Sequence, residues 1–293
     1  MRAKLISKLG VWMCLALFLL PHTAWSGDFD KGVLWKVSKA GQQSSYILGT
    51  IHSAHPEVTN LPPQLKSIFN QASSFTVEVD LNAQAMMQLQ SQLFLPGDKS
   101  LKKIIGPQLY QKCVLLMSQY GVPEPIVDKM KPWVIAVELS APKDAKGQIL
   151  DLKLYQIAQQ KGLKIYGLET VEEQLNVFDG LSSAQQKRIL GHAINAFPTM
   201  PQKYSALIQF YVNRDLRGML VFNDQEMNHL DSSLREILVK RLITERNRLM
   251  VERMQPQLRD GKAIIAIGAL HLPGEQGVLQ LLENRGYRIN AVY

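Results

Sequence analysis

The feature that most constrains the fold is an alternation of short apolar segments with helical patterns. At the carboxyl end, an apolar segment at 263–267 is followed by a helical pattern at 276–285 and a second apolar segment at 287–292. In the middle of the chain, a helical pattern at 151–158 precedes an apolar segment at 163–168. Strands that alternate with helices are typical of α/β folds, in which helices cover the faces of a sheet. The sequence therefore predicts an α/β fold with a mixed sheet flanked by many helices.

The amino-terminal half supplies further strands. Segments 33–37 and 44–51 have strand-like composition, and the turn residues at 39–42 between them predict a β-hairpin. The short segment 75–79 is rich in β-branched and aromatic residues, which predicts a buried strand. Across 83–140, Pro and Gly punctuate a mostly helical pattern. The predicted sheet thus takes strands from both ends of the chain.

The first 26 residues have the layout of a secretory signal peptide. Basic residues start the chain, an apolar run spans 11–20, and Ala24-Trp25-Ser26 offers small residues at the two positions that a signal peptidase reads. A membrane-spanning helix needs about 20 apolar residues, and this run is roughly half that length. We therefore predict cleavage after Ser26, a periplasmic or secreted protein, and no stable membrane span after cleavage.

The remaining chain, 27–293, is long enough to bury one large core. It contains no long polar linker and no low-complexity segment, so we expect a single domain. The formal net charge is +8, yet the basic residues are scattered singly or in pairs. A nucleic-acid-binding surface would instead concentrate them and interleave them with aromatic residues. We therefore expect a solvated basic surface and no nucleic acid partner.

Two distant turns share one plan. Gly49-Thr-Ile-His52 and Gly268-Ala-Leu-His271 each follow an apolar segment, and the two histidines are 219 positions apart. A glycine at the end of a strand lets the chain turn sharply and lets another group approach closely. A histidine three residues later would emerge at the carboxyl edge of the sheet, where α/β folds bind ligands. We therefore pair His52 with His271 in one candidate site, which His55 could join.

Two carboxylates are candidates to complete this site. Glu78 lies in the apolar segment 75–80, where a carboxylate is costly unless it is paired or bound to a cation. Glu169 directly follows the segment 163–168, again at the expected carboxyl edge. Each has a structural alternative. Glu78 could form a buried ion pair with an arginine, and Glu169 could favour the dipole of the following helix.

Two neutral imidazoles and a carboxylate are ordinary ligands of zinc, manganese, cobalt or iron, with positions left for water. His52, His271 and Glu78 therefore predict a divalent metal centre. Such a cation lowers the pKa of bound water and polarises a carbonyl group. Arg246 lies in a long helical pattern at 231–254, where most arginines are solvated, so the pattern alone does not assign it to the site.

Five motifs, in this order, together resemble the TraB/GumN family, which also contains the Tiki metalloproteases. They are Gly49-Thr-Ile-His52, Glu78, Gly167-Leu-Glu-Thr-Val-Glu-Glu-Gln174, Glu245-Arg-Asn247 and Gly268-Ala-Leu-His-Leu-Pro-Gly274. The resemblance covers essentially the whole chain after residue 26 and includes the tail at 277–289. It departs from the family pattern at Pro273, where valine is common, and this changes only the turn.

The resemblance implies a fold like that of the erythromycin esterase and ChaN group. It also implies a site built from both Gly-x-x-His motifs with acidic and basic residues nearby. The Tiki members are similar metal-dependent peptidases that use manganese or cobalt. Matched position by position, the resemblance implies site roles for His52, His271, Glu78, Glu169, Arg246 and Asn247.

The leading hypothesis is a metal-dependent hydrolase of the peptidase type, acting on a peptide or small-molecule substrate. The two histidines and Glu78 would hold the metal, and Glu78 or Glu169 would accept a proton from water. Arg246 would stabilise the developing negative charge. One alternative is a metal-independent, esterase-like hydrolase in which a histidine activates water. Another is a non-enzymatic haem- or ligand-binding protein, since the ChaN relatives are similar to haem binders.

Overall fold

A computed structural model of the protein describes residues 29–142 and 147–293. The predicted signal peptide, 1–26, lies outside the described residues. The described chain forms two compact units. We call them the helical unit, which comprises residues 81–142 and 171–205, and the sheet unit, which comprises 29–80, 147–170 and 206–293. The expectation of a single domain from 27 to 293 stays a prediction, as does export of the protein.

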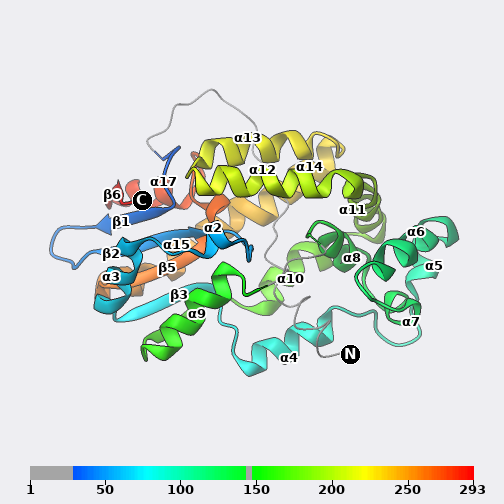
Figure 1. Cartoon of the computed structure of the whole chain (residues 1–293), viewed down its shortest axis with the longest axis horizontal. Coiled ribbons are helices and arrows are strands. Elements are labelled where there is room, and N and C mark those ends of the chain that lie inside the picture. Colours follow the sequence, from blue (N-terminus) through cyan, green and yellow to red (C-terminus); the bar gives the residue numbers. More distant parts are fainter. Residues whose placement is uncertain (1–28, 143–146) are drawn as a thin grey trace. The chain divides into compact units, whose positions relative to one another are not determined.

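The sheet unit contains a six-stranded mixed sheet in the order β4-β3-β5-β2-β1-β6. Strands β4, β3, β5 and β2 form a parallel run, and β1 is antiparallel to both β2 and β6. Figure 1 shows β2 (blue) beside β5 (orange), although they come from opposite ends of the described chain. The predicted α/β class is therefore confirmed. The strands are β1 (Leu34–Ser38), β2 (Ser45–Thr50), β3 (Ser74–Val79), β4 (Lys164–Glu169), β5 (Ala263–Gly268) and β6 (Arg288–Ala291).

The register of the sheet aligns the two Gly-x-x-His turns. In the parallel pair β2 and β5, Gly49 lies opposite Ile267 and Thr50 lies opposite Gly268. Parallel strands end at the same edge of a sheet, so both turns leave it at the carboxyl edge. The predicted hairpin is also confirmed, because β1 and β2 are antiparallel partners and the Gln42 N–H donates to the Lys39 carbonyl at 3.1 Å.

Helices connect the strands of the sheet unit. The predicted patterns at 151–158 and 276–285 correspond to α9 and α17. Among the residues that the structure describes, no helix combines the length and apolar character needed to cross a membrane. The helical elements of this unit are α2 (Pro56–Thr59), α3 (Pro63–Gln71), α9 (Leu150–Gln160), α13 (Leu216–Met227), α14 (Ser232–Val239), the π-helical turn η2 (Lys240–Thr244), α15 (Glu245–Arg253), α16 (Gln255–Asp260), the 3-10 turn η3 (Ala269–His271) and α17 (Val278–Glu283).

The helical unit is built around α8 (Pro132–Leu139), whose residues are all buried. Trp133 stacks on Phe178 with 5.3 Å between ring centroids, and its indole N–H donates to Asp179 at 2.7 Å. The helical character predicted for 83–140 is confirmed. The other elements are α4 (Ala83–Gln92), α5 (Leu101–Ile105), α6 (Pro107–Ser118), α7 (Glu124–Val127), α10 (Val171–Asp179), α11 (Ser183–Ala196) and η1 (Phe197–Thr199), while α12 (Met200–Val212) begins in this unit and ends in the sheet unit.

The long helical pattern predicted around Arg246 is interrupted by the π-helical turn η2. Buried residues recur every four positions along it, at Leu234, Leu238, Leu242, Arg246 and Met250. In an α-helix of 3.6 residues per turn, a four-residue spacing drifts by about 40° at each step. The wider π turn takes up part of this drift. Arg246 therefore stays on the buried side of the helix.

Gly49 provides a test of the packing between β2 and η3. A Cβ at this position would lie 2.7 Å from Leu272 Cδ1 and 3.0 Å from Ala269 Cα. We expect Gly49→Ala to destabilise the protein by roughly 1–3 kcal/mol, because the turn after β5 must shift to make room. The measurement is the urea unfolding midpoint followed by circular dichroism. Gly191→Ala is the control, since a Cβ there meets nothing within 4 Å. Equal effects of the two substitutions would contradict the close approach.

Candidate active site

Four adjacent parallel strands bring predicted site residues to the carboxyl edge of the sheet. His52 follows β2, and His271 lies in η3 directly after β5. Glu78 is the penultimate residue of β3, and Glu169 is the last residue of β4. Since β4, β3, β5 and β2 are consecutive in the sheet, these side chains start from neighbouring strand ends. Ligand sites of α/β folds lie at this edge.

Arg246 joins the two glutamates. Its Nε donates to Glu169 Oε1 at 2.8 Å and its Nη2 donates to Glu169 Oε2 at 2.7 Å, which makes a bidentate pair. The same Nη2 donates to Glu78 Oε2 at 2.7 Å. All three side chains are at least nine-tenths buried, with the Glu169 side chain only 2% exposed. The structural alternative for Glu78, a buried ion pair with an arginine, is therefore present in the structure.

Glu78 is held as an ionised carboxylate. Its Oε1 accepts a hydrogen bond from the Gly268 N–H at 2.7 Å. Burial raises the pKa of this carboxyl, but burial is outweighed by Arg246 and, to a smaller degree, by His271, the Gly268 N–H and His52, so the pKa falls from 4.5 to about 2. Glycine permits the contact, because a Cβ at position 268 would lie only 3.3 Å from Glu78 Oε1. The result is a fixed negative charge that acts on both histidines.

Asn247 fixes the ring of His271. The amide Nδ2 of Asn247 donates to the Gln276 carbonyl at 2.7 Å, so its Oδ1 is the atom that faces His271 Nδ1, at 2.6 Å. This oxygen can only accept, which places the ring proton on Nδ1. Burial, and then the charge of Arg246, lower the pKa of His271 from 6.5 to about 3 despite the opposing effect of Glu78. At neutral pH His271 is therefore a neutral imidazole, and its Nε2 lies 3.8 Å from Glu78 Oε1.

His52 is held by Asp151, a residue that the sequence did not identify as part of the site. Its Nδ1 lies 2.6 Å from Asp151 Oδ2, and the Thr50 hydroxyl donates to Asp151 Oδ1 at 2.7 Å. Asp151 lies in the first turn of α9, where a carboxylate is ordinarily explained by the helix dipole. A carboxylate on Nδ1 orients the ring and makes the other nitrogen more basic. The two histidines therefore differ, since one faces a carboxylate and the other a neutral amide.

Tyr211 supports the turn before His52. Its buried hydroxyl donates to the Gly49 carbonyl at 2.9 Å. Burial raises the pKa of this phenol, so it remains a protonated donor. His55, in contrast, is not drawn into these contacts, because its side chain is 42% exposed and lies 3.8 Å from Glu57.

The sequence profile of the TraB/PrgY/gumN family matches residues 33–291. The chain belongs to the TraB/PrgY/gumN family. The resemblance found in its motifs is thereby confirmed. No solved structure matches the chain significantly. The predicted likeness of its fold to the erythromycin esterase and ChaN group therefore stays a prediction.

Curated relatives of this TraB/PrgY/gumN chain include proteins with and without a known activity. The uncharacterized protein YbaP of Escherichia coli is 23% identical over 270 residues, which cover 89% of this chain and 97% of YbaP. Metalloprotease TIKI1 of Homo sapiens is 25% identical over 309 residues, which cover 87% of this chain and 61% of TIKI1. Metalloprotease TIKI2 of Danio rerio is 24% identical over 310 residues, which cover 87% of this chain and 60% of TIKI2. Proteolysis is therefore an activity named among its relatives.

The donor atoms of the site, imidazole nitrogen and carboxylate oxygen, are of the types that bind divalent cations. The 3.8 Å between His271 Nε2 and Glu78 Oε1 is too long for a hydrogen bond. It is also shorter than the sum of two metal–ligand bonds, about 4.2 Å, so one cation could contact both atoms. His52 does not complete the set, because within 29–142 and 147–293 no group of three or more His, Cys, Asp or Glu side chains is arranged to hold a metal. A three-residue metal centre would therefore require side-chain shifts from these positions.

Removal of the buried guanidinium tests the ion-pair network. We expect Arg246→Met to destabilise the protein by about 3–5 kcal/mol, because it leaves two buried carboxylates without their cation. The free energy of urea unfolding is the readout. Arg248→Met is the matched control, since this exposed arginine lies two residues away and its substitution should change stability by less than about 0.5 kcal/mol. A loss for Arg246→Met no larger than that of the control would rule out a structural ion pair.

The depressed pKa of His271 predicts acid sensitivity of the metal-free protein. Between pH 6.5 and about 3, the unfolded chain binds a proton on this imidazole that the folded chain does not. The contribution of the neutral His271 to the free energy of unfolding is therefore fully present above pH 6.5 and declines as the pH falls. Glu78 adds its own loss only between pH 4.5 and about 2. Urea unfolding across the first interval, with chelator present, should show a shallower decline for His271→Gln and an unchanged decline for His229→Gln. Identical declines for wild type and His271→Gln would contradict the depressed pKa.

Proposed function

We propose that this chain is a hydrolase of the peptidase type, assisted by a divalent cation and acting on a peptide or small amide substrate. The observation that carries this proposal is the placement of two imidazoles, a carboxylate and a guanidinium at one sheet edge. Amide hydrolysis needs a water nucleophile, a group that accepts its proton, and positive charge near the carbonyl oxygen. The TIKI metalloproteases among its relatives support the same reaction class.

The residues that would hold the cation are His52, His271 and Glu78. At neutral pH His271 is neutral and Glu78 is ionised, and these are the protonation states in which each group binds a metal. The family resemblance implies manganese or cobalt, and zinc or iron would accept the same donors. When bound, a divalent cation would lower the pKa of water and polarise the scissile carbonyl. Asp151 and Asn247 would orient the two rings through their Nδ1 atoms.

The glutamates differ in how well they could accept a proton from water. Both oxygens of Glu169 accept hydrogen bonds from Arg246, so this residue is better suited to orient the guanidinium. Glu78 Oε2 accepts from Arg246, while its Oε1 accepts from the Gly268 N–H and lies 3.8 Å from His271 Nε2. We therefore assign proton acceptance to Glu78 and charge stabilisation at the carbonyl oxygen to Arg246. A pKa of about 2 makes Glu78 a weak base, however.

A second candidate function is hydrolysis without a metal, in which His52 accepts the proton. The 2.6 Å contact between His52 Nδ1 and Asp151 supports it, because a carboxylate behind an imidazole is the arrangement that strengthens a histidine base. The weak basicity of Glu78 points the same way. The haem-binding alternative stays a prediction, and the His271 side chain, which is only 4% exposed, is unsuited to serve as an exposed haem ligand.

Hydrolysis of a mixed peptide library by protein purified without chelator, with added manganese or cobalt, tests the proposal. We expect His52→Ala and His271→Ala to abolish cleavage, because each removes an imidazole from the site. Asp151→Asn should lower kcat by roughly 10–100-fold with little change in KM, since it orients a catalytic group rather than the substrate. Mass spectrometry of the fragments is the measurement, and elemental analysis reports the bound metal.

The exposed His229 supplies the matched control, and His229→Ala should cleave as the wild type does. Loss of activity with chelator, and its return with the metal, would support the metal-dependent form. Activity that resists chelator but requires His52 would support the second form. A folded protein that binds no metal, and whose cleavage is unaffected by both histidine substitutions, would end both.

A further inference from the structure

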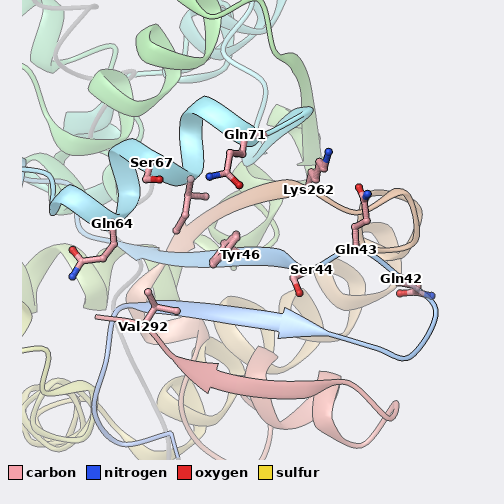
Figure 2. Close-up of a pocket in the computed structure, with 11 residues that line it drawn as sticks. Gln42, Gln43, Ser44, Tyr46, Gln64, Ser67, Gln71, Lys262 and Val292 are labelled. Carbon is pink, nitrogen blue, oxygen red and sulfur yellow. The ribbon is translucent and has the colours of Figure 1, made fainter.

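A second candidate binding site lies at the other end of β2. A groove with a volume of about 670 Å³ is formed by the turn between β1 and β2, the start of β2, α3 and the residue before β5. This volume is within the range of small-ligand sites. Figure 2 shows Tyr46 on β2 between α3 and the turn that carries Gln42 and Gln43. Tyr46 lies four residues before the end of β2 at Thr50, or roughly 13 Å along the strand, and His52 lies beyond that end, so the groove is separate from the candidate active site.

The lining of the groove, as far as the structure describes it, combines polar and apolar surface in similar measure and contains no carboxylate. Gln42, Gln43, Gln64 and Gln71 contribute amides that can both donate and accept hydrogen bonds. Two serines and Tyr46 add hydroxyl groups, and the Tyr46 ring adds an apolar surface. The buried amide oxygen of Gln42 has no hydrogen-bond partner among the described residues, so turning it toward a ligand breaks no bond. This inventory suits a ligand with many hydroxyl groups.

Lys262 places a positive charge at one end of the groove. Its backbone has a φ of +53°, which is uncommon for a residue other than glycine. The conformation is held from both sides, because the Lys262 N–H donates to the Ser44 carbonyl at 3.1 Å and the Ser73 N–H donates to the Lys262 carbonyl at 3.0 Å. The side chain is exposed, and in the described part of the chain it forms no ion pair. Such strained positions cluster at ligand sites.

We propose that this groove binds an oligosaccharide that carries a carboxylate. The glutamine amides would bind sugar hydroxyls, Tyr46 would pack against the apolar face of a sugar ring, and Lys262 would pair with the carboxylate. A peptide is the competing ligand, because Tyr46, Ile68, Ala72 and Val292 also give the lining apolar surface, and the experiment must separate the two. The proposal does not depend on hydrolytic activity, since it concerns binding at a different end of the strand.

Isothermal titration calorimetry of the full chain with hexagalacturonate, its methyl ester and a hyaluronan hexasaccharide tests the proposal. We expect at least one acidic oligosaccharide to bind, and the methyl ester to bind more weakly. Lys262→Asn should weaken acidic binding by about tenfold, because a charge-assisted contact is lost while asparagine tolerates the left-handed backbone. Gln71→Ala should weaken it several-fold. Neither substitution lies in the buried core, and circular dichroism verifies the fold of each variant.

Lys66→Asn is the matched control, because this exposed lysine is on α3 but outside the groove. It should leave the affinity unchanged. Absence of binding by both acidic oligosaccharides would overturn the proposal. Equal weakening by Lys66→Asn and Lys262→Asn would also overturn it, since attraction to the overall basic surface would then suffice. So would tighter binding of hexaglutamate than of hexagalacturonate, which would mark the groove as a peptide site.

Discussion

The ion pairs of the Arg246 guanidinium organise the carboxyl edge of the sheet. A buried carboxylate is costly unless a positive charge and hydrogen bonds accompany it, and Glu78 and Glu169 both meet this condition through the same guanidinium. The contacts tie α15 to β3 and β4. The same helix carries Asn247, which fixes the ring of His271. One helix therefore sets both the charge of Glu78 and the orientation of a histidine.

The two Gly-x-x-His turns are alike in sequence but different in chemistry. His271 is buried beside a neutral amide and the charge of Arg246, which keeps it unprotonated at neutral pH. His52 instead faces the carboxylate of Asp151. Groups whose surroundings differ in this way can divide the roles of base and of neutral donor or ligand within one site. The proposed hydrolase has a metal-dependent and a metal-independent form. The hydrogen bonds at the Nδ1 atoms of the two rings, more than the rings themselves, distinguish these forms.

Strand β2 links the two ends at which we propose chemistry and binding. Its amino-terminal part carries Tyr46, which lines the groove, and its carboxyl end leads into the turn of His52. The strand is hydrogen-bonded on both sides, to β5 and to β1. An extended strand held in this way has little freedom to change length. The spacing between the groove and the candidate active site is therefore a property of the sheet.

The sequence by itself determined the class of fold and the edge at which His52 and His271 lie. Apolar periodicity and turn residues are local signals, and a glycine at the end of a parallel strand directs the next residues to the carboxyl edge. Only the tertiary structure showed that Asp151 holds His52, because the two are far apart along the chain and an acid at a helix start already has a local explanation. Only it showed that Arg246 faces inward, because the π turn shifts the helical phase, and that burial depresses the pKa of His271. Burial and partners depend on what folds around a residue, which no local pattern records.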